Sequence, residues 1–288
     1  MRLKGLEIII IAVYCLSIVF LISTFSDANN FKKSKDEILQ EKSVLKQLRE
    51  GTISEKTNAL QEINNWKSIY PLSTEIVAEI LLLAEKKREG SDFVRRGEFG
   101  LSYDIELIYA LGNTRDVRAI PYLMDDLSDP AAKEGFHKIG EPAIEPLIEK
   151  LHDKLDGYRS GAARALSLYL KPNEGYLAQG EIRKRIKEEL IAELKNPRNN
   201  DPARSIKWYE IEAQGRAGVR ENIIVALGYL AEEGDKEVIP IIKSTAEEDP
   251  YYLDMSKKTN YTGPQKRYMV REEAKKILVR LKTKGILK

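Results

Sequence analysis

The chain has 288 residues, of which 42% are hydrophobic and 32% are charged, so it can build a sizeable core and is not intrinsically disordered. Its formal net charge is only +2, which leaves no strong overall field to steer it onto nucleic acid. The single Cys excludes a disulfide scaffold and a thiolate metal centre.

The segment 1–28 is typical of a signal peptide or of a single-span membrane anchor. Two basic residues precede an apolar run at 8–25, whose length lies at the border between the two. Ser26 and Ala28 are small residues suited to signal cleavage, whereas the length of the run favours a retained anchor. We therefore expect a protein outside the cytoplasm that is periplasmic, secreted or membrane-anchored, with the membrane as a partner if the segment is kept.

The region that follows the leader is predicted to be helical. Apolar residues recur every three or four positions from Ile38 to Leu48, from Leu60 to Ile69 and from Ile76 to Ala84, which is the spacing of one helix face. Glycine or proline follows each stretch and is expected to stop the helix. Because no strand-like alternation of apolar and polar residues competes with this spacing, we expect no sheet.

The chain contains an internal repeat from about residue 101 onward. Residues 119–129 recur as 143–153, with a match in apolar or acidic type at seven of eleven positions, and weaker copies lie at 186–196 and 238–249. A second apolar element precedes each copy, and its small Ala and Gly residues permit a close approach to a neighbouring helix. We expect glycine to end this element. In the four copies it covers residues 107–112, 136–140, 162–166 and 223–228.

This arrangement resembles HEAT repeats, in particular the short HEAT-like repeats of the phycobilisome-lyase type, over roughly residues 101–283. The resemblance implies an all-α fold, an α-solenoid in which each helix pair buries its apolar face on the next pair. Three stretches of this chain depart from the regular spacing of the family. They are expected to be irregular insertions at residues 171–180, 197–218 and 251–267.

The expected domain organisation combines these parts. Residues 1–28 are the signal peptide or anchor, and residues 29–100 form N-terminal helices that are degenerate repeats or a cap. Residues 101–288 are the HEAT-like array with its insertions.

Motifs for catalysis or metal binding are missing from the sequence. His137 and His152 are the only histidines and lack partners at metal-ligand spacing, so we expect them to be structural. Gly135 and Gly140 have the separation of a P-loop, but Glu141 stands where the phosphate-binding Lys is needed. We expect no enzyme, no catalytic residue, no metal and no cofactor.

The two longer insertions combine aromatic and cationic residues on segments that helix packing does not need. Tyr, Trp and Arg dominate the energies of protein interfaces, so these residues are candidates for a partner surface. The alternative is that the aromatic side chains cap the hydrophobic edge between repeats. Because both insertions follow outer helices, we expect them on one edge of the array. The candidates are Arg204, Trp208, Tyr209, Arg216, Tyr251, Tyr252 and Tyr261.

Three functions are compatible with this sequence. The leading hypothesis is a non-catalytic scaffold outside the cytoplasm that presents a solenoid surface to a partner protein. A lyase-associated HEAT protein that handles a bound small molecule is the second. The third is a HEAT-like DNA glycosylase in which Trp208 and Tyr209 stack on a base, but the near-zero net charge and the apolar leader favour no nucleic-acid partner.

Overall fold

A computed structural model describes residues 33–66, 71–90, 100–172, 176–196, 211–254, 262–263 and 266–288 of the chain. The expected signal peptide or anchor, residues 1–28, lies outside the described residues. No helix within these described ranges has both the length and the apolar character needed to cross a bilayer. The described chain is all-α apart from one pair of very short strands, as the apolar spacing predicts.

Contacts divide the chain into two compact units, residues 1–44 and 45–288. The described part of the first unit contains the start of helix α2 (Lys35–Glu50). A reciprocal capping pair begins this helix: the Ser34 amide donates to Glu37 Oε2 at 2.8 Å, and the Glu37 amide donates to Ser34 Oγ at 3.1 Å.

The second unit begins with the end of α2 and continues through α3 (Ile53–Asn64) and α4 (Thr74–Arg88). Thr52 caps α3, because its hydroxyl accepts from the Glu55 amide and the Glu55 carboxylate accepts from the Thr52 amide at 2.7 Å. Hydrogen bonds from the Thr52 amide and hydroxyl to the Glu55 carboxylate hold the pKa of Glu55 below its ordinary value. Both α3 and α4 pack on α5 (Gly100–Thr114), so the unit continues across residue 100.

The repeat copies and the elements before them form successive helix pairs. Each copy supplies the second, even-numbered helix of a pair, and the preceding element supplies the odd-numbered one. The pairs are α5 (Gly100–Thr114) with α6 (Ile120–Asp125), α7 (Pro130–Ile139) with α8 (Ile144–Leu151), α9 (Asp156–Leu168) with α10 (Gly180–Lys195), and α11 (Ile211–Glu232) with α12 (Val238–Glu248), after which comes α13 (Met269–Thr283).

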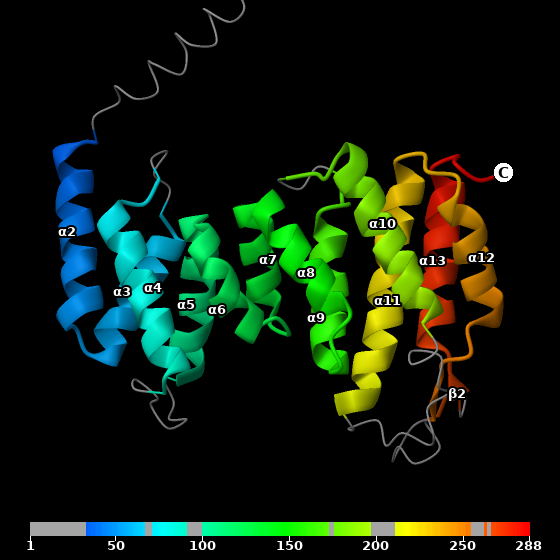
Figure 1. Ribbon diagram of the computed structural model, residues 1–288, viewed down its shortest axis with the longest axis horizontal. Coiled ribbons are helices and arrows are strands. Elements are labelled where there is room, and N and C mark those ends of the chain that lie inside the picture. The colour runs from blue at the N-terminus through cyan, green and yellow to red at the C-terminus, as the bar shows by residue number, and fades with distance from the viewer. Residues whose placement is uncertain are drawn as a thin grey trace, which may run out of the picture. The chain divides into compact units, whose positions relative to one another are not determined.

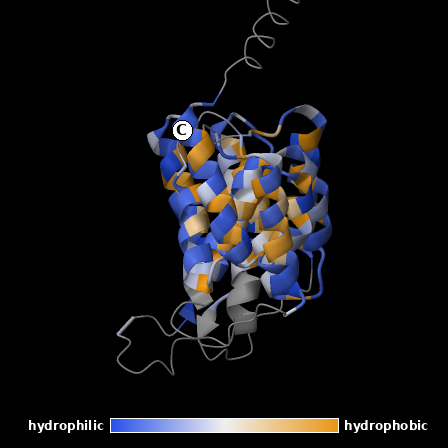
Figure 2. Cartoon of the chain, turned by 90° about the vertical axis from the view of Figure 1, so that its left-hand side faces the viewer, coloured by the Kyte–Doolittle hydropathy of each residue, from blue (hydrophilic) through white to orange (hydrophobic). Residues whose placement is uncertain are grey.

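The helices of the second unit stand side by side, in chain order up to α11, and α13 stands between α11 and α12 (Figure 1). Each of the odd-numbered helices from α5 to α11 packs on the next odd-numbered one, while α8 contacts both α9 and α10. Hydrophobic and hydrophilic residues interleave along the helices, as an amphipathic packing requires (Figure 2). Leu123 and Leu147, which occupy the same place in two repeat copies, are both fully buried.

Glycine ends α7 as expected, but it does not end α5 or α11. Gly112 does not end α5, which continues to Thr114. It lies where α5 crosses α7, and a Cβ atom at this position would come within 2.5 Å of the Gly135 Cα atom. Gly140 does end α7, with a φ of 88° that favours glycine. The small residue at position 112 therefore predicts the close packing correctly, but the expected end of α5 at Gly112 is wrong.

Replacing Gly112 by Ala is expected to lower the free energy of unfolding by about 1–3 kcal/mol, because the added methyl group meets backbone atoms of α7. Alanine is otherwise the better helix former. Gly157→Ala in α9 is the matched control: a Cβ there meets nothing within 4 Å, so stability should rise by about 0.5–1 kcal/mol. Urea unfolding followed by circular dichroism measures both. A Gly112→Ala variant as stable as the wild type refutes the contact.

Two of the expected insertions contain regular structure. Helix α11 begins at Ile211, so it takes up the end of the insertion expected at 197–218. Strands β1 (Leu253–Asp254) and β2 (Lys266–Arg267) pair antiparallel within the insertion at 251–267. The expectation of no sheet is therefore wrong here, because the segments that leave α12 and enter α13 run antiparallel and pair their backbones. Strands of two residues are too short to show alternation in the sequence.

Candidate functional site

The structure describes the predicted partner surface only in part. Arg204, Trp208, Tyr209 and Tyr261 lie outside the described residues, and Arg216 is described for its backbone in α11 alone. Tyr251 and Tyr252 follow α12 directly. We therefore place the candidate site at the end of the second unit, where two short strands connect α12 to α13.

A buried ion pair fixes this end of the unit. Asp249, 3% exposed, follows α12 and accepts a hydrogen bond from Arg220 Nε of α11 at 2.9 Å. Arg220 Nη1 also donates to the Leu194 carbonyl oxygen in the last turn of α10, at 2.7 Å. One guanidinium thus joins the ends of α10 and α12 to α11, and each charge is compensated where water is excluded.

The same aspartate sets the path of the chain after α12. Its Oδ1 atom accepts from the Tyr251 amide at 3.0 Å, and its carbonyl oxygen accepts from Arg271 Nε of α13 at 2.6 Å. Tyr251 is fully buried. Since its side chain is part of the core, Tyr251 offers no surface to a partner, and its inclusion among the partner-binding candidates is corrected. Tyr252, the next residue, is half-buried.

The strand pairing brings a second tyrosine to Tyr252. Leu253 pairs with Arg267, so Tyr252 and Tyr268, the next residues outward on the two strands, lie close to each other. Their ring centroids are 5.6 Å apart. Lys266 Nζ lies 4.4 Å from the centre of the Tyr252 ring. The Arg271 guanidinium lies 4.3 Å from that of Tyr268. We call Tyr252, Lys266, Tyr268 and Arg271 the tyrosine–cation cluster.

Three of these four residues are absent from the predicted set. Lys266 lies at the far end of the insertion, Tyr268 follows it directly, and Arg271 lies in the first turn of α13. A hairpin register would have found Tyr268, because an antiparallel pair places residues at equal distances from the turn opposite each other. No sequence signal marks Arg271, whose place depends on the carbonyl group of Asp249.

A groove of about 560 Å³ lies beside the buried ion pair, between α10 and α12. Leu194, Pro240 and Ile241 form apolar walls, and Arg220 and Asp249 belong to its lining. These two charged groups bind each other and nearby backbone groups. Their contacts therefore hold helix ends together.

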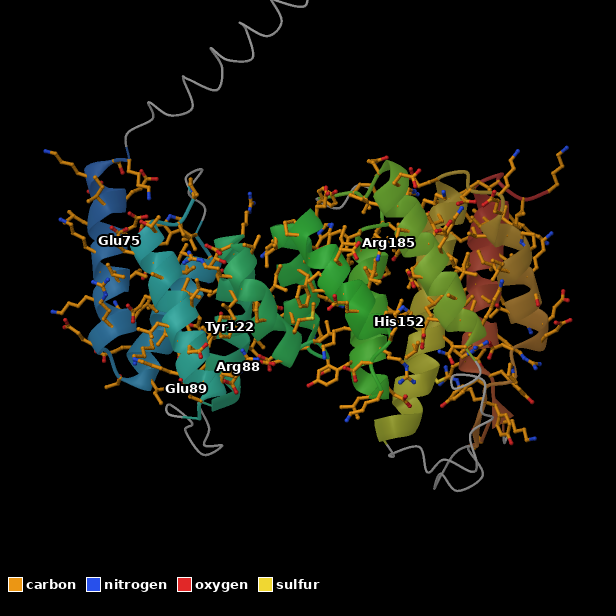
Figure 3. The ribbon with its side chains drawn as sticks, viewed as in Figure 1. Glu75, Arg88, Glu89, Tyr122, His152 and Arg185 are labelled. Atoms are coloured by element: carbon orange, nitrogen blue, oxygen red, sulfur yellow. The ribbon has the colours of Figure 1, made fainter. Side chains whose placement is uncertain are left out.

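Both histidines have local partners. His152, labelled in Figure 3, places Nε2 3.0 Å from Glu189 Oε2 and Nδ1 3.4 Å from Glu193 Oε2. His137 Nε2 lies 2.9 Å from the Tyr176 carbonyl oxygen. Among the residues that the structure describes, no group of three or more His, Cys, Asp or Glu side chains is arranged to hold a metal ion. Each histidine therefore contacts a neighbouring element of the fold.

Two acidic side chains of α13 form ion pairs with nearby cations. Glu272 accepts from Arg267 Nε at 3.2 Å, and Glu273 accepts from Lys276 Nζ at 2.9 Å. Burial and the nearby Glu273 raise the pKa of Glu221 on α11, against the opposing effects of Lys276 and Arg267. Glu272 and Glu273 are thus paired with cations, and α13 itself contains five Lys or Arg against these two Glu.

Comparison with protein-family models finds none that matches this chain, and a search of curated proteins finds no significant similarity.

Proposed function

We propose that the chain is a non-catalytic protein-interaction scaffold outside the cytoplasm, an α-solenoid of HEAT-like helix pairs that presents the tyrosine–cation cluster to a partner protein. The observation that carries the proposal is the cluster itself. Two half-buried tyrosines lie side by side with a cation on each ring, and a buried ion pair holds the backbone beneath them.

The order of helix packing supports the solenoid. Four successive pairs repeat the same sequence pattern, and each odd-numbered helix from α5 to α11 contacts the next odd-numbered one. Repeat proteins are built in this way, since each unit packs mainly on its neighbours and the chain offers an extended surface.

Physical chemistry of the cluster supports an interface. Tyrosine brings a large amphipathic surface at a low cost in side-chain entropy, and Tyr and Arg are enriched among residues that dominate binding energies. Because Asp249 fixes both Tyr251 and Arg271, the cluster is ordered before any partner arrives. Preorganisation of this kind lowers the entropic cost of association.

The alternatives have weaker support. A base-stacking role, as in a glycosylase, needs open ring faces, whereas each ring of the cluster already has a cation on one face and the other tyrosine beside it. The groove between α10 and α12 has the volume of a small-molecule site. Two of its charged lining residues, Arg220 and Asp249, however, bind each other, which favours the scaffold over the lyase-associated function.

Partner recovery tests the proposal. The tagged full chain is isolated from the membrane fraction of its host, and the molecules that co-purify are identified by mass spectrometry. Tyr252→Ser combined with Tyr268→Ser should reduce recovery of the partner protein at least about tenfold, as expected for residues that dominate an interface. Thermal unfolding of this double variant should match the wild type.

Tyr122 and Tyr158 provide the matched control, because each lies under a cation elsewhere in the same unit, Arg88 at 5.9 Å and Lys150 at 4.7 Å (Figure 3 labels Tyr122 and Arg88). Their double Ser variant should keep the partner. Full recovery with the Tyr252 and Tyr268 variant contradicts the proposal. So does a chromophore or DNA as the only molecule that co-purifies.

A further inference from the structure

Positive charge is concentrated at the end of the unit that contains the cluster. Residues 266–288 include nine Lys or Arg and two Glu, a net charge of +7, whereas the whole chain carries +2. The preceding 265 residues therefore carry a net charge of −5. The near-neutral net charge of the whole chain is therefore the sum of a basic C-terminal end and an acidic remainder.

A stripe along α13 extends this charge away from the cluster. Arg271, Lys275, Val279 and Lys282 are spaced by four, four and three residues, which places them within about 80° of one another around a helix. Lys275 and Lys282 are exposed, and Val279 is 64% exposed. We call these four residues the α13 stripe, which begins within the tyrosine–cation cluster at Arg271.

The two lysines of the stripe are not paired with the nearby carboxylates of the described residues, so their charge can act on a partner. Within the described residues, Lys275 and Lys282 have no carboxylate partner, while Glu272 and Glu273 bind Arg267 and Lys276. A further carboxylate near α13, Glu232 of α11, binds Arg280 and Lys284. The acidic groups of this end thus neutralise cations outside the stripe.

We propose that the α13 stripe binds an acidic segment of the partner protein, beside the tyrosine–cation cluster. This inference rests on the proposed function, since it names the chemistry of the partner at the same surface. Complementary charge steers encounter and fixes orientation at interfaces, and exposed cations without internal partners are the groups that supply it. The apolar Val279 between two lysines fits a segment in which apolar residues separate the acidic ones.

The distribution of charge favours an acidic protein segment over other anions. A nucleic acid or an anionic membrane is extended, so it also meets the net negative charge carried by the rest of the chain. A short acidic segment meets only the stripe. Screening at physiological salt limits the interaction to about 8 Å, which matches contact with a single helix face.

Photo-crosslinking from position 279 tests this inference in the full chain. p-Benzoylphenylalanine replaces Val279, which is exposed at the centre of the stripe and uncharged, so the lysines remain in place. After irradiation in host membranes, mass spectrometry identifies the cross-linked peptide. We expect a partner peptide with an excess of Asp and Glu. Lys275→Glu combined with Lys282→Glu should reduce the cross-link at least about tenfold, since it reverses the charges that attract the segment.

Lys184→Glu combined with Arg185→Glu is the charge-matched control on α10, where both side chains are more than half exposed (Figure 3 labels Arg185). This variant should keep the cross-link. Several results overturn the inference while leaving the proposed function in place: a cross-link to a neutral or basic peptide, one that survives reversal of Lys275 and Lys282, or no cross-link although the partner still co-purifies. A cross-link to lipid or nucleic acid alone contradicts both proposals.

Discussion

Replacing Leu147 by Asp is expected to lower the free energy of unfolding by about 4 kcal/mol or more, which is enough to unfold many domains. Leu147 is fully buried in α8 and occupies the same repeat position as Leu123 in α6. A carboxylate placed there has no partner and loses its hydration. Leu123→Asp should therefore behave in the same way, and differential scanning calorimetry measures both variants.

Leu155→Asp is the control for this charge. Leu155 is 52% exposed and is the N-cap residue of α9, a position where Asp is favoured because its side chain accepts from free amide groups. Its melting temperature should equal or exceed that of the wild type. If Leu147→Asp and Leu155→Asp melt alike, the assignment of inward positions in the repeat is wrong.

Replacing Arg220 by Met is expected to cost about 3–5 kcal/mol, because it leaves the buried carboxylate of Asp249 without its counter-charge. The loss should also release the chain after α12, since Asp249 holds Tyr251 and Arg271. Urea unfolding gives the change in free energy. Asp249→Asn in the Arg220→Met background should recover part of the stability, because it removes the unpaired charge.

Arg185→Met tests an exposed ion pair of similar length for comparison. Arg185 lies 2.9 Å from Glu145, with both side chains more than half exposed, so its loss should cost no more than about 1 kcal/mol. Equal costs for the Arg220 and Arg185 variants contradict a central role for the buried pair.

Local features of the sequence account for the helix pairs. Apolar residues at intervals of three and four predict the helices, and the repeat copies correspond to α6, α8, α10 and α12. Asp129, which closes the first copy, caps α7 by accepting from the Ala131 amide at 2.7 Å. These features are predictable because each depends on residues close together in the chain.

Features that depend on distant residues were not predictable. Asp249 has the sequence appearance of a helix stop, but its partner Arg220 lies on the preceding helix. Tyr251 and Tyr252 are identical in type, and only the fold makes one of them core and the other half-buried. Arg271 joins the site through a backbone carbonyl, a contact that no pattern of residue types encodes.

The basic end of the chain was within reach of the sequence. Counting charge by segment separates the +7 of residues 266–288 from the rest, whereas the total of +2 conceals it. The periodicity of α13 then assigns Lys275 and Lys282 to one face. Their lack of carboxylate partners within the described chain, however, depends on where α11 and the two strands lie.

Hydrogen–deuterium exchange of the full chain, free and bound to its partner, is the most direct test that binding occurs at the tyrosine–cation cluster and the α13 stripe. Binding slows amide exchange where it removes opening motions or covers the backbone. We predict protection of residues 252–254 and 266–283, with unchanged exchange in α4 to α8. Protection confined to α4 to α8, or to the walls of the groove between α10 and α12, contradicts the account.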